Sequence, residues 1–303
     1  MAYDAADPRS SLGSGAHKAA AKGYGDASYV KFYETDPQLV DESSRTWLAR
    51  GAYFVVAYTE AAAGAGLVRR GQADEYIVLV PDEDGKIEVG AAGESLSVSG
   101  PSLVIVPPGD SSITVAGDGR VVRIFSHLAT DLAAISANAS VYDSDQPNLD
   151  AYESWPAPKE GYAIRAYSLS VEPTPARFGR IWRSSNLMVN YSYPRPGPRE
   201  VTKMSPHTHE GFEQGSLVLG GSFVHHVRYP WTTDMRNWRN DEHDICAGPS
   251  LAVIPPLLVH TSQQVGREIN QLVDIFGPPR FDFSEMDGWV LNAEEYPMPG
   301  ETA

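Results

Sequence analysis

The sequence predicts an all-β protein built from two tandem β-barrels with few short helices. Two observations lead to this prediction. Many short segments rich in β-branched and aromatic residues are separated by turns rich in Gly, Pro and Asp, a pattern typical of barrels and sandwiches. In addition, one β-unit occurs twice along the 303 residues, which indicates two similar halves.

The predicted strands form two runs with a break in the middle of the chain. The first run covers residues 52–58, 76–80, 86–89, 95–98, 103–106, 112–115 and 121–125. The second run covers residues 162–171, 187–191, 216–219, 222–228, 251–254 and 271–275. Between the runs, residues 128–139 contain no Gly or Pro and have apolar side chains at helical spacing, so we expect a helix there.

The repeat is strongest at residues 100–108 and 248–256. These segments read Gly-Pro-Ser-Leu-Val-Ile-Val-Pro-Pro and Gly-Pro-Ser-Leu-Ala-Val-Ile-Pro-Pro, with six of nine positions identical. Two units are too few for a propeller or a solenoid, which stack more repeats. We therefore expect an N-terminal arm over residues 1–45, one barrel over residues 46–145 and a second barrel over residues 146–303.

The charge balance limits the classes of partner. The chain has 39 acidic and 24 basic side chains, a formal charge of −15, which disfavours binding to nucleic acid or to an anionic membrane. Its single cysteine cannot form an internal disulfide, and no stretch approaches the roughly 20 apolar residues of a membrane helix. These features predict a soluble, cytoplasmic protein that binds neither nucleic acid nor membranes.

Three histidines and a side-chain oxygen form a candidate metal site in the second half. Side chains at i and i+2 of a strand point to the same face, so His207 and His209 are expected to direct their imidazoles at one ion, with His260 as a third ligand. Glu213 and Gln214 face opposite sides of a strand, so only one of them can supply the oxygen. Three imidazoles and one oxygen suit zinc, copper, iron or nickel.

The first of these segments resembles a signature motif of the cupin superfamily. That motif reads His-x-His, three or four residues, Glu or Gln, six residues, Gly, and the chain matches it with His207, His209, Gln214 and Gly221. Glu213 satisfies the looser form of the motif and is the alternative ligand. Gln214 is preferred because residues 217–221 then align with a Val-Leu-x-Gly turn common in cupins.

The second cupin motif reads Gly, five residues, Pro-x-Gly-x-x-His. The chain is similar at Gly248, Pro255 and His260, with Leu257 in place of the usual glycine and one extra residue between the first Gly and Pro. The resemblance covers the barrel parts of both halves. It implies a bicupin, in which two jelly-roll barrels follow each other in one chain.

The first half lacks the candidate ligands. Aligning the two halves places other residues opposite the four ligands: Val68 opposite His207, Arg70 opposite His209, Glu75 opposite Gln214 and Ser112 opposite His260. We therefore expect a metal site only in the C-terminal barrel.

The segment after the first motif offers candidate pocket residues. If it is a strand, His226 and Arg228 share one face and His225 lies on the other. Arginine suits bidentate binding of a carboxylate, and histidine can act as a general acid or base. His226 and Arg228 are therefore the candidate catalytic residues, and the expected substrate is a small molecule that bears a carboxylate.

The resemblance implies a metal-dependent enzyme with one divalent ion per chain, Fe²⁺ being favoured and Zn²⁺, Ni²⁺ or Mn²⁺ the alternatives. The first prediction is an Fe(II)-type dioxygenase that cleaves a small aromatic or dicarbonyl acid. The first alternative is a non-redox isomerase, lyase or hydratase on a small keto acid or sugar acid, in which the ion polarises a carbonyl. The second alternative is a bicupin that stores or binds a ligand without catalysis. A homo-oligomer is also expected, because bicupins are often dimers or larger.

Overall fold

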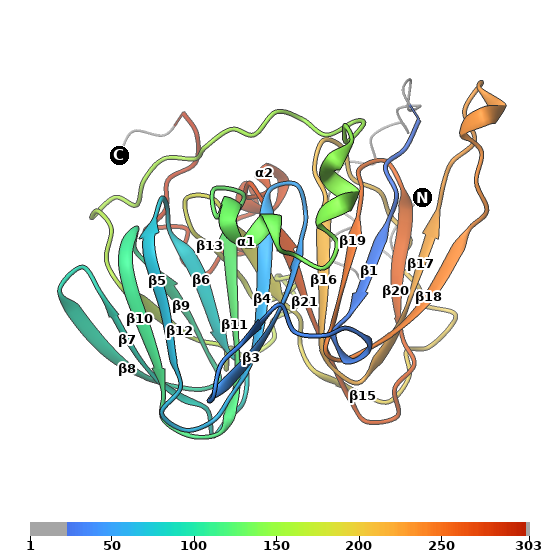
Figure 1. Cartoon of the computed structure of the whole chain (residues 1–303). Coiled ribbons are helices and arrows are strands. Elements are labelled where there is room, and N and C mark those ends of the chain that lie inside the picture. Colours follow the sequence, from blue (N-terminus) through green and yellow to red (C-terminus); the bar gives the residue numbers. More distant parts are fainter. Residues whose placement is uncertain (1–22, 301–303) are drawn as a thin grey trace.

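The computed structural model describes residues 23–300, and these form two β-barrels that lie side by side (Figure 1). The predicted all-β class with few short helices is confirmed. Residues 1–22 of the predicted N-terminal arm lie outside the described residues.

The first barrel consists of a seven-stranded and a four-stranded sheet. The larger sheet has the order β12-β9-β6-β11-β4-β3-β2, formed by Arg165–Ser168, Ser102–Val106, Tyr76–Val80, Gly119–Ser126, Phe54–Ala61, Ser44–Arg50 and Leu39–Val40. The smaller sheet has the order β5-β10-β7-β8, formed by Gly66–Gln72, Gly109–Val115, Lys86–Ala91 and Glu94–Ser99. All pairings in this barrel are antiparallel.

The second barrel repeats this plan. Its larger sheet has the order β1-β19-β16-β21-β14-β13, with β15 paired to β21; these strands are Ser28–Lys31, Ser250–Ile254, Gln214–Gly220, Ile269–Phe276, Met188–Tyr191, Ile181–Arg183 and Arg195–Pro196. Its smaller sheet has the order β18-β17-β20, formed by Glu242–Ala247, Ser222–Arg228 and Val259–Gln264.

The two large sheets correspond strand by strand. Strands β9, β6, β11, β4 and β3 stand in the same order as β19, β16, β21, β14 and β13. The repeated segments found in the sequence provide β9 and β19, the second strand of each sheet. The internal repeat is therefore a repeat of the barrel.

Each barrel takes its outermost strand from outside its own predicted segment. Strand β1, which lies in the predicted arm, pairs with β19 of the second barrel. Strand β12, which lies beyond residue 145, pairs with β9 of the first barrel. The strands of the two barrels thus cross the boundaries expected at residues 45 and 145, and they do so at equivalent places.

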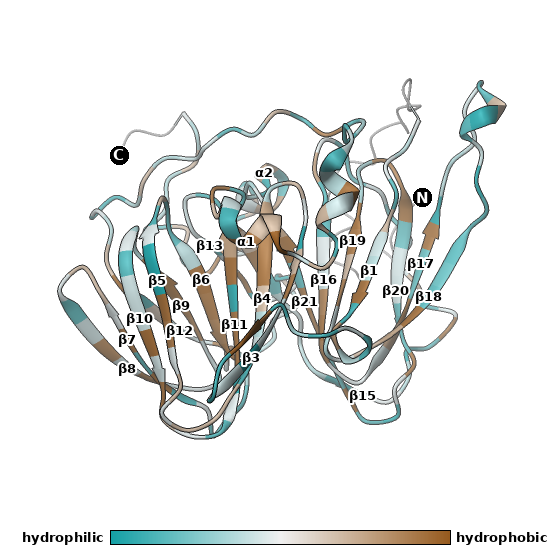
Figure 2. Cartoon of the chain, in the orientation of Figure 1, coloured by the Kyte–Doolittle hydropathy of each residue, from teal (hydrophilic) through white to brown (hydrophobic). Residues whose placement is uncertain are grey.

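The apolar core between the barrels explains the sequence of the central strands. Every residue of β6 (Tyr-Ile-Val-Leu-Val) is buried, because one face lines the barrel and the other meets the second barrel. Ile77 and Leu79 pack in one cluster with Leu217 and Ile275 of the second barrel. Figure 2 shows these central strands as mostly apolar.

The helix expected over residues 128–139 is shorter than predicted. The α-helix α1 spans only Thr130–Ala134, and a 3-10 turn, η3, follows at Ala139–Asp143. The side chain of Asn138 accepts a hydrogen bond from the Arg50 backbone N–H and donates one to the Arg50 carbonyl. These two hydrogen bonds hold Asn138 against β3. A continuous helix over residues 128–139 is not compatible with this contact.

Within residues 23–300, three further short helical elements occur: η2 at Phe32–Glu34, η4 at Met235–Asn237 and α2 at Phe281–Ser284. Among residues 23–300, the helices are all too short to span a bilayer.

Candidate metal centre and pocket

The segment that contains His207 and His209 joins the small sheet of the second barrel at one point. His207 and His260 form an isolated antiparallel bridge, with N···O distances of 3.0 and 2.8 Å between their backbones. Residues 208 and 209 are not in a strand, although the Leu257 N–H donates to the His209 carbonyl at 2.8 Å. A bridge, and not the regular strand expected from the sequence, brings the three histidines together.

The three imidazole rings lie close to one another. The ring centroids of His207 and His260 are 4.3 Å apart, those of His209 and His260 are 4.9 Å apart, and those of His207 and His209 are 6.4 Å apart. The His209 ring also stacks on Phe212, with centroids at 4.5 Å. His209 therefore packs against His260 on one side and against the Phe212 ring on another.

Burial keeps two of these imidazoles neutral. Desolvation and then the charge of His260 hold the pKa of His209 well below its usual range. Desolvation likewise lowers the pKa of His260 to about 4, and the Arg280 charge adds to this effect. A neutral imidazole presents the lone pair that a metal ion binds.

The hydrogen-bond partners of the ring nitrogens indicate which of these nitrogens could bind an ion. Both ring nitrogens of His209 and Nε2 of His260 are buried without a hydrogen-bond partner, while Nδ1 of His260 lies 3.0 Å from the Leu258 carbonyl. Such unsatisfied buried nitrogens cost free energy that a cation would recover. Within residues 23–300, however, no three His, Cys, Asp or Glu side chains are arranged as a finished metal cluster. The types of donor atom suit an ion, although the side chains as placed do not form a complete ligand group.

Gln214 and Glu213 point in opposite directions, as expected of neighbours on a strand. Gln214 is at the start of β16 and faces the pocket beside His207 and His260. Glu213 instead accepts a hydrogen bond from the Ala52 N–H at 2.5 Å, in the first barrel. Burial raises the pKa of Glu213 to about 7. Of the two oxygen candidates, only Gln214 lies on the side of the histidines.

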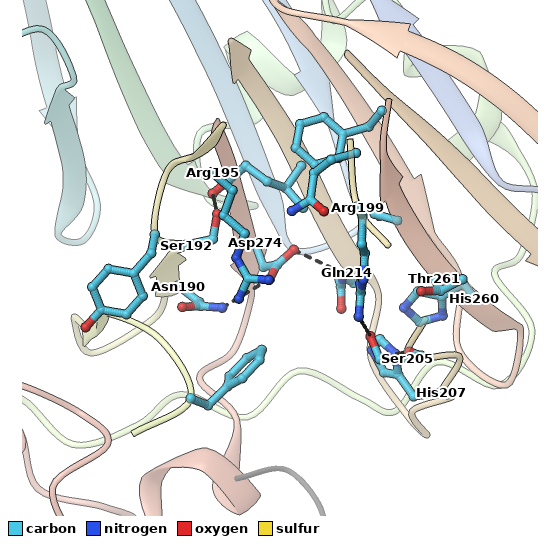
Figure 3. Close-up of a pocket in the computed structure, with 16 residues that line it drawn as sticks. Asn190, Ser192, Arg195, Arg199, Ser205, His207, Gln214, His260, Thr261 and Asp274 are labelled. Carbon is cyan, nitrogen blue, oxygen red and sulfur yellow. Dashed lines mark hydrogen bonds between the residues drawn. The ribbon is translucent and has the colours of Figure 1, made fainter. Parts of the chain in front are cut away.

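A cavity of about 130 Å³ opens next to these residues (Figure 3). That volume has room for a molecule of only a few heavy atoms, since each water in the liquid occupies about 30 Å³. Most of the lining is polar, and it comes from the strands of both sheets and from the β14–β16 connection: Asn190, Ser192, Arg195, Arg199, Ser205, His207, Gln214, His260, Thr261 and Asp274.

The sequence interpretation missed the carboxylate of this pocket. Asp274 lies on β21, where its Oδ1 accepts hydrogen bonds from Gln214 at 3.2 Å and Ser216 at 3.3 Å. Its Oδ2 accepts from Asn190 at 3.2 Å. The available signal was an aspartate within the otherwise apolar run of residues 272–276.

Two arginines of the pocket were missed as well. Arg195 lies on the short strand β15, and Arg199 follows it in the same connection. The Arg199 guanidinium donates to the Lys203 carbonyl at 2.6 Å and to Ser205 Oγ at 3.2 Å. Both residues are in an irregular segment, where neither strand periodicity nor a motif predicts orientation.

The expectation that His226 and Arg228 line the pocket is wrong. The side chains of β17 alternate, and His225 points inward while His226 and Arg228 point away from the cavity. His226 contacts His243 across the sheet, and the exposed Arg228 pairs with Asp241 at 2.6 Å. The strand was predicted correctly, but the choice of its inner face was not.

His225, on the inner face, is fully buried behind the cluster. Its Nδ1 lies 2.9 Å from Ser262 Oγ, and its Nε2 has no partner. Burial lowers the pKa of His225 to about 4, with the charge of His260 as the next cause.

Leu257, which replaces the usual glycine of the second motif, adopts a left-handed backbone with φ of 69°. This region favours glycine and costs a residue with a Cβ of the order of 1 kcal/mol. The Leu257 side chain is buried in a cluster with Tyr24 and Val227, which offsets that cost. The motif turn is therefore kept without its glycine.

The first barrel has other residues at the equivalent positions. Ser112 pairs with Val68, as His260 pairs with His207, so this part of the predicted alignment agrees with the strand register. The expected match of Glu75 with Gln214 is wrong by one residue. Tyr76 lies opposite Val106, as Gln214 lies opposite Ile254, so Tyr76 is the counterpart of Gln214.

No family model matches the chain, and no curated protein sequence matches it. Solved structures do resemble it. The oxalate decarboxylase of Lactobacillus farciminis in its formate complex has 15% identity and a TM-score of 0.54, with 85% of this chain and 88% of that chain covered. The Bacillus subtilis oxalate decarboxylase with Mn(II) centres has 13% identity and a TM-score of 0.55, with 85% and 78% covered.

A third solved structure, the protein Ylba from E. coli, has 12% identity and a TM-score of 0.52, with 86% of this chain and 94% of that chain covered. At these identities the likeness concerns the fold. The fold shared with these structures is a pair of cupin barrels.

Proposed function

We propose that this chain, which has the double-barrel cupin fold, is a metal-dependent enzyme that acts on a small carboxylate in its C-terminal barrel. The observation that carries the proposal is the pocket itself. Two of the clustered histidines, a glutamine and an aspartate meet there with two arginines in a cavity of about 130 Å³. A barrel with only a structural role does not need such a set of polar and charged side chains around a cavity.

The substrate class follows from charge and size. Arg199 is half-buried at the cavity and is oriented by the Lys203 carbonyl and Ser205. A guanidinium held in this way binds a carboxylate through two parallel hydrogen bonds. The chain's overall charge of −15 repels anions, so Arg195 and Arg199 supply the local positive potential that an acid requires.

His207, His209, His260 and Gln214 would hold one divalent ion, which when bound supplies a Lewis acid beside the substrate. The neutral state of the buried His209 and His260 prepares them for that role. Gln214 is oriented by its hydrogen bonds to Ser216 at 3.0 Å and to Asp274. The amide nitrogen donates both bonds, so the amide oxygen remains the atom that is suited to a cation.

The position of Asp274 supports a reaction that involves proton transfer. Its carboxylate lies on the cavity wall next to Gln214, where it can accept a proton from a bound acid or return one to it. Asn190 and Ser216 hold the carboxylate in place. We therefore favour a non-redox isomerase, lyase or hydratase acting on a small keto acid or sugar acid.

An iron(II) dioxygenase for a small aromatic or dicarbonyl acid is the second candidate. Three imidazoles with a neutral amide suit iron as well as zinc, nickel or manganese. The small cavity accommodates a dicarbonyl acid more readily than an aromatic one. Oxygen dependence separates the two candidates.

The test combines metal analysis with turnover of a panel of small keto acids and dicarboxylic acids, in air and under nitrogen. We expect one divalent ion per chain and equal turnover under both atmospheres. Turnover is expected to fall by about 10²-fold or more in Asp274→Asn, and KM to rise in Arg199→Gln. Consumption of oxygen in step with product would establish the dioxygenase instead.

A matched pair of variants controls for the site. His207→Ala/His260→Ala is expected to lose the ion, whereas His226→Ala, which alters a histidine outside the cavity, keeps both ion and turnover. A stoichiometric ion in the double variant contradicts the ligand assignment. Tight binding of an acid without any turnover would favour a storage or ligand-binding role.

A further inference from the structure

The interior of the first barrel contains an arginine whose guanidinium has no hydrogen-bonded or ion-pair partner among the described residues. Arg123 lies on β11, and the residue is 7% exposed. Its Nε has no hydrogen-bond partner, and the ion pairs found among residues 23–300 do not include it. A guanidinium carries five N–H donors and is almost never buried without acceptors.

Arg123 occupies the position in the first barrel that Asp274 occupies in the second barrel. On the paired strand, Arg123 is opposite Val78, and Asp274 is opposite Ser216. Val78 and Ser216 both lie two residues after the equivalent positions Tyr76 and Gln214. The same inner position therefore carries a positive charge in the first barrel and a negative charge in the second.

Aromatic rings and a second guanidinium surround Arg123. Its Cζ lies 5.8 Å from the ring centroid of Phe125, and the Tyr76 ring stacks on Phe125 with centroids at 4.7 Å. Arg69 lies 5.3 Å from the same Phe125 ring. Tyr76 Oη and Ser111 Oγ are 2.9 Å apart, so two hydroxyl groups are also present.

The second guanidinium does not relieve the charge of the first. Arg69 has its own carboxylate, because its two Nη atoms donate to Asp131 at 2.5 and 2.8 Å, and its Nε donates to Gln72. Desolvation lowers the pKa of Arg123 to about 10, and the charge of Arg69 acts in the same direction. Arg123 is thus still charged at neutral pH, and a mostly buried charge without a counter-ion is unfavourable.

We propose that the first barrel binds a small carboxylate against Arg123, with Tyr76 and Ser111 as hydroxyl neighbours. The ligand pairs with the guanidinium through two carboxylate oxygens, and acetate is the simplest anion that tests for it. The barrel that lacks the histidines thereby becomes a separate anion site. This proposal does not depend on the metal site of the second barrel, because it rests on Arg123 alone.

Thermal unfolding of the full chain in sodium acetate and in sodium chloride at equal ionic strength tests the proposal. A ligand that binds only the folded state raises the unfolding midpoint, and we expect saturating acetate to raise it by about 2–4 °C. Arg123→Met, which keeps the length of the side chain and removes the charge, is expected to abolish this rise. An equal rise in Arg123→Met and in the unmodified chain overturns the proposal, as does the absence of any rise in the unmodified chain.

A second variant separates this site from the pocket of the second barrel. Arg195→Gln/Arg199→Gln removes the arginines proposed to bind the substrate, and it is expected to keep the acetate effect. Loss of the effect in that variant assigns acetate to the second barrel and overturns the proposal. If Arg123→Met does not fold, a crystal structure of the unmodified chain with bromoacetate decides the question. Anomalous bromine density beside Arg123 supports the site, and its absence there overturns it.

Discussion

At the scale of single residues, the direction of one side chain separates a metal-ligand candidate from a structural contact. Gln214 and Glu213 are neighbours, yet one faces the pocket and the other accepts a hydrogen bond from the first barrel. The alternation of a strand produces this difference. The resemblance to the cupin motif favours Gln214 and leaves Glu213 as the alternative, and their surroundings in the structure distinguish the two.

The proposed ligand set predicts that one of two neighbouring substitutions lowers the affinity for the ion and that the other leaves it unchanged. Gln214→Ala removes the amide oxygen on the side of the histidines, so the affinity for the divalent ion is expected to fall about tenfold or more. Glu213→Gln changes a group that points away, so its ion content is expected to equal that of the unmodified chain. Elemental analysis after dialysis against a weak chelator measures both. A greater loss of metal in Glu213→Gln contradicts the assignment.

His225 predicts a pH dependence of stability. Its pKa in the folded state is about 4, below the ordinary value near 6.5, so the unfolded chain binds the proton more tightly. The contribution of His225 to the free energy of unfolding is therefore fully present above about pH 6.5 and is lost as the pH falls through about 4, by roughly 3 kcal/mol.

Urea unfolding of the metal-free chain across this pH range measures the slope. His225→Phe keeps a ring near Tyr29 and Phe223 and removes the titrating group, so its slope is expected to be shallower. The remaining slope includes the contributions of His209 and His260, whose pKa values are also lowered, and of Glu213, whose raised pKa acts in the opposite direction. An unchanged slope in His225→Phe would show that the imidazole is charged or hydrated in the folded chain.

At the scale of elements, the exchange of outer strands joins the two barrels more firmly than a linker alone. Strand β1 extends the large sheet of the second barrel, and Val30 lies opposite Leu251. The Val30 side chain is buried in the core shared by both barrels. A strand from the N-terminal part of the chain is thus part of the structure of the C-terminal barrel.

Val30→Ala is therefore expected to lower the free energy of unfolding by about 2 kcal/mol, because it removes two buried methyl groups and leaves a cavity. Val40→Ala, at a position of β2 that is 65% exposed, is the matched control and is expected to change it by less than about 0.5 kcal/mol. Thermal or urea unfolding compares the two. Equal effects would show that β1 does not contribute to the core.

At the scale of the whole molecule, two buried glutamates link the barrels in equivalent ways. Glu213 of the second barrel accepts hydrogen bonds from the Ala52 N–H and the Tyr142 hydroxyl. Glu75 of the first barrel accepts hydrogen bonds from the Ser185 N–H at 3.1 Å and, through Oε1, from the Tyr296 hydroxyl at 2.9 Å. Burial raises the pKa of both carboxyl groups.

The sign of this shift predicts a loss of stability as the pH rises from acidic toward neutral solution. The folded-state pKa of Glu213 is about 7, above the ordinary value near 4.3, so the folded chain binds the proton more tightly. This contribution is fully present below about pH 4 and is lost as the pH rises through about 7, with a total of roughly 3 kcal/mol. Glu213→Gln keeps a hydrogen-bond acceptor for Ala52 without titrating.

We therefore expect Glu213→Gln to be more stable than the unmodified chain near about pH 8, and similar to it near about pH 4. Denaturant unfolding at the two pH values provides the comparison, and Glu75→Gln at the equivalent position is expected to act in the same direction. A destabilised Glu213→Gln at the higher pH would show that the ionised carboxylate is the favoured form in the folded chain.

The sequence alone determined the parts of this protein that depend on local pattern. Apolar runs predicted strands such as β6 and β17 with their observed bounds, and the repeated segments predicted two barrels. Motif spacing also assigned His207 and His260 to one site, and their backbones do form a bridge. Such features depend on short motifs and on residues near one another in sequence, where periodicity and turn chemistry act directly.

Only the tertiary structure decided how distant residues meet. The pairing of β1 with β19, the inner face of β17, and the place of Asp274 and Arg199 in the pocket all depend on contacts across the chain. The unpaired charge of Arg123 is invisible in sequence for the same reason, because a strand arginine is usually solvated. Burial and partners are properties of the packed barrels, and they determine which polar residues stabilise the fold and which are left to bind a ligand.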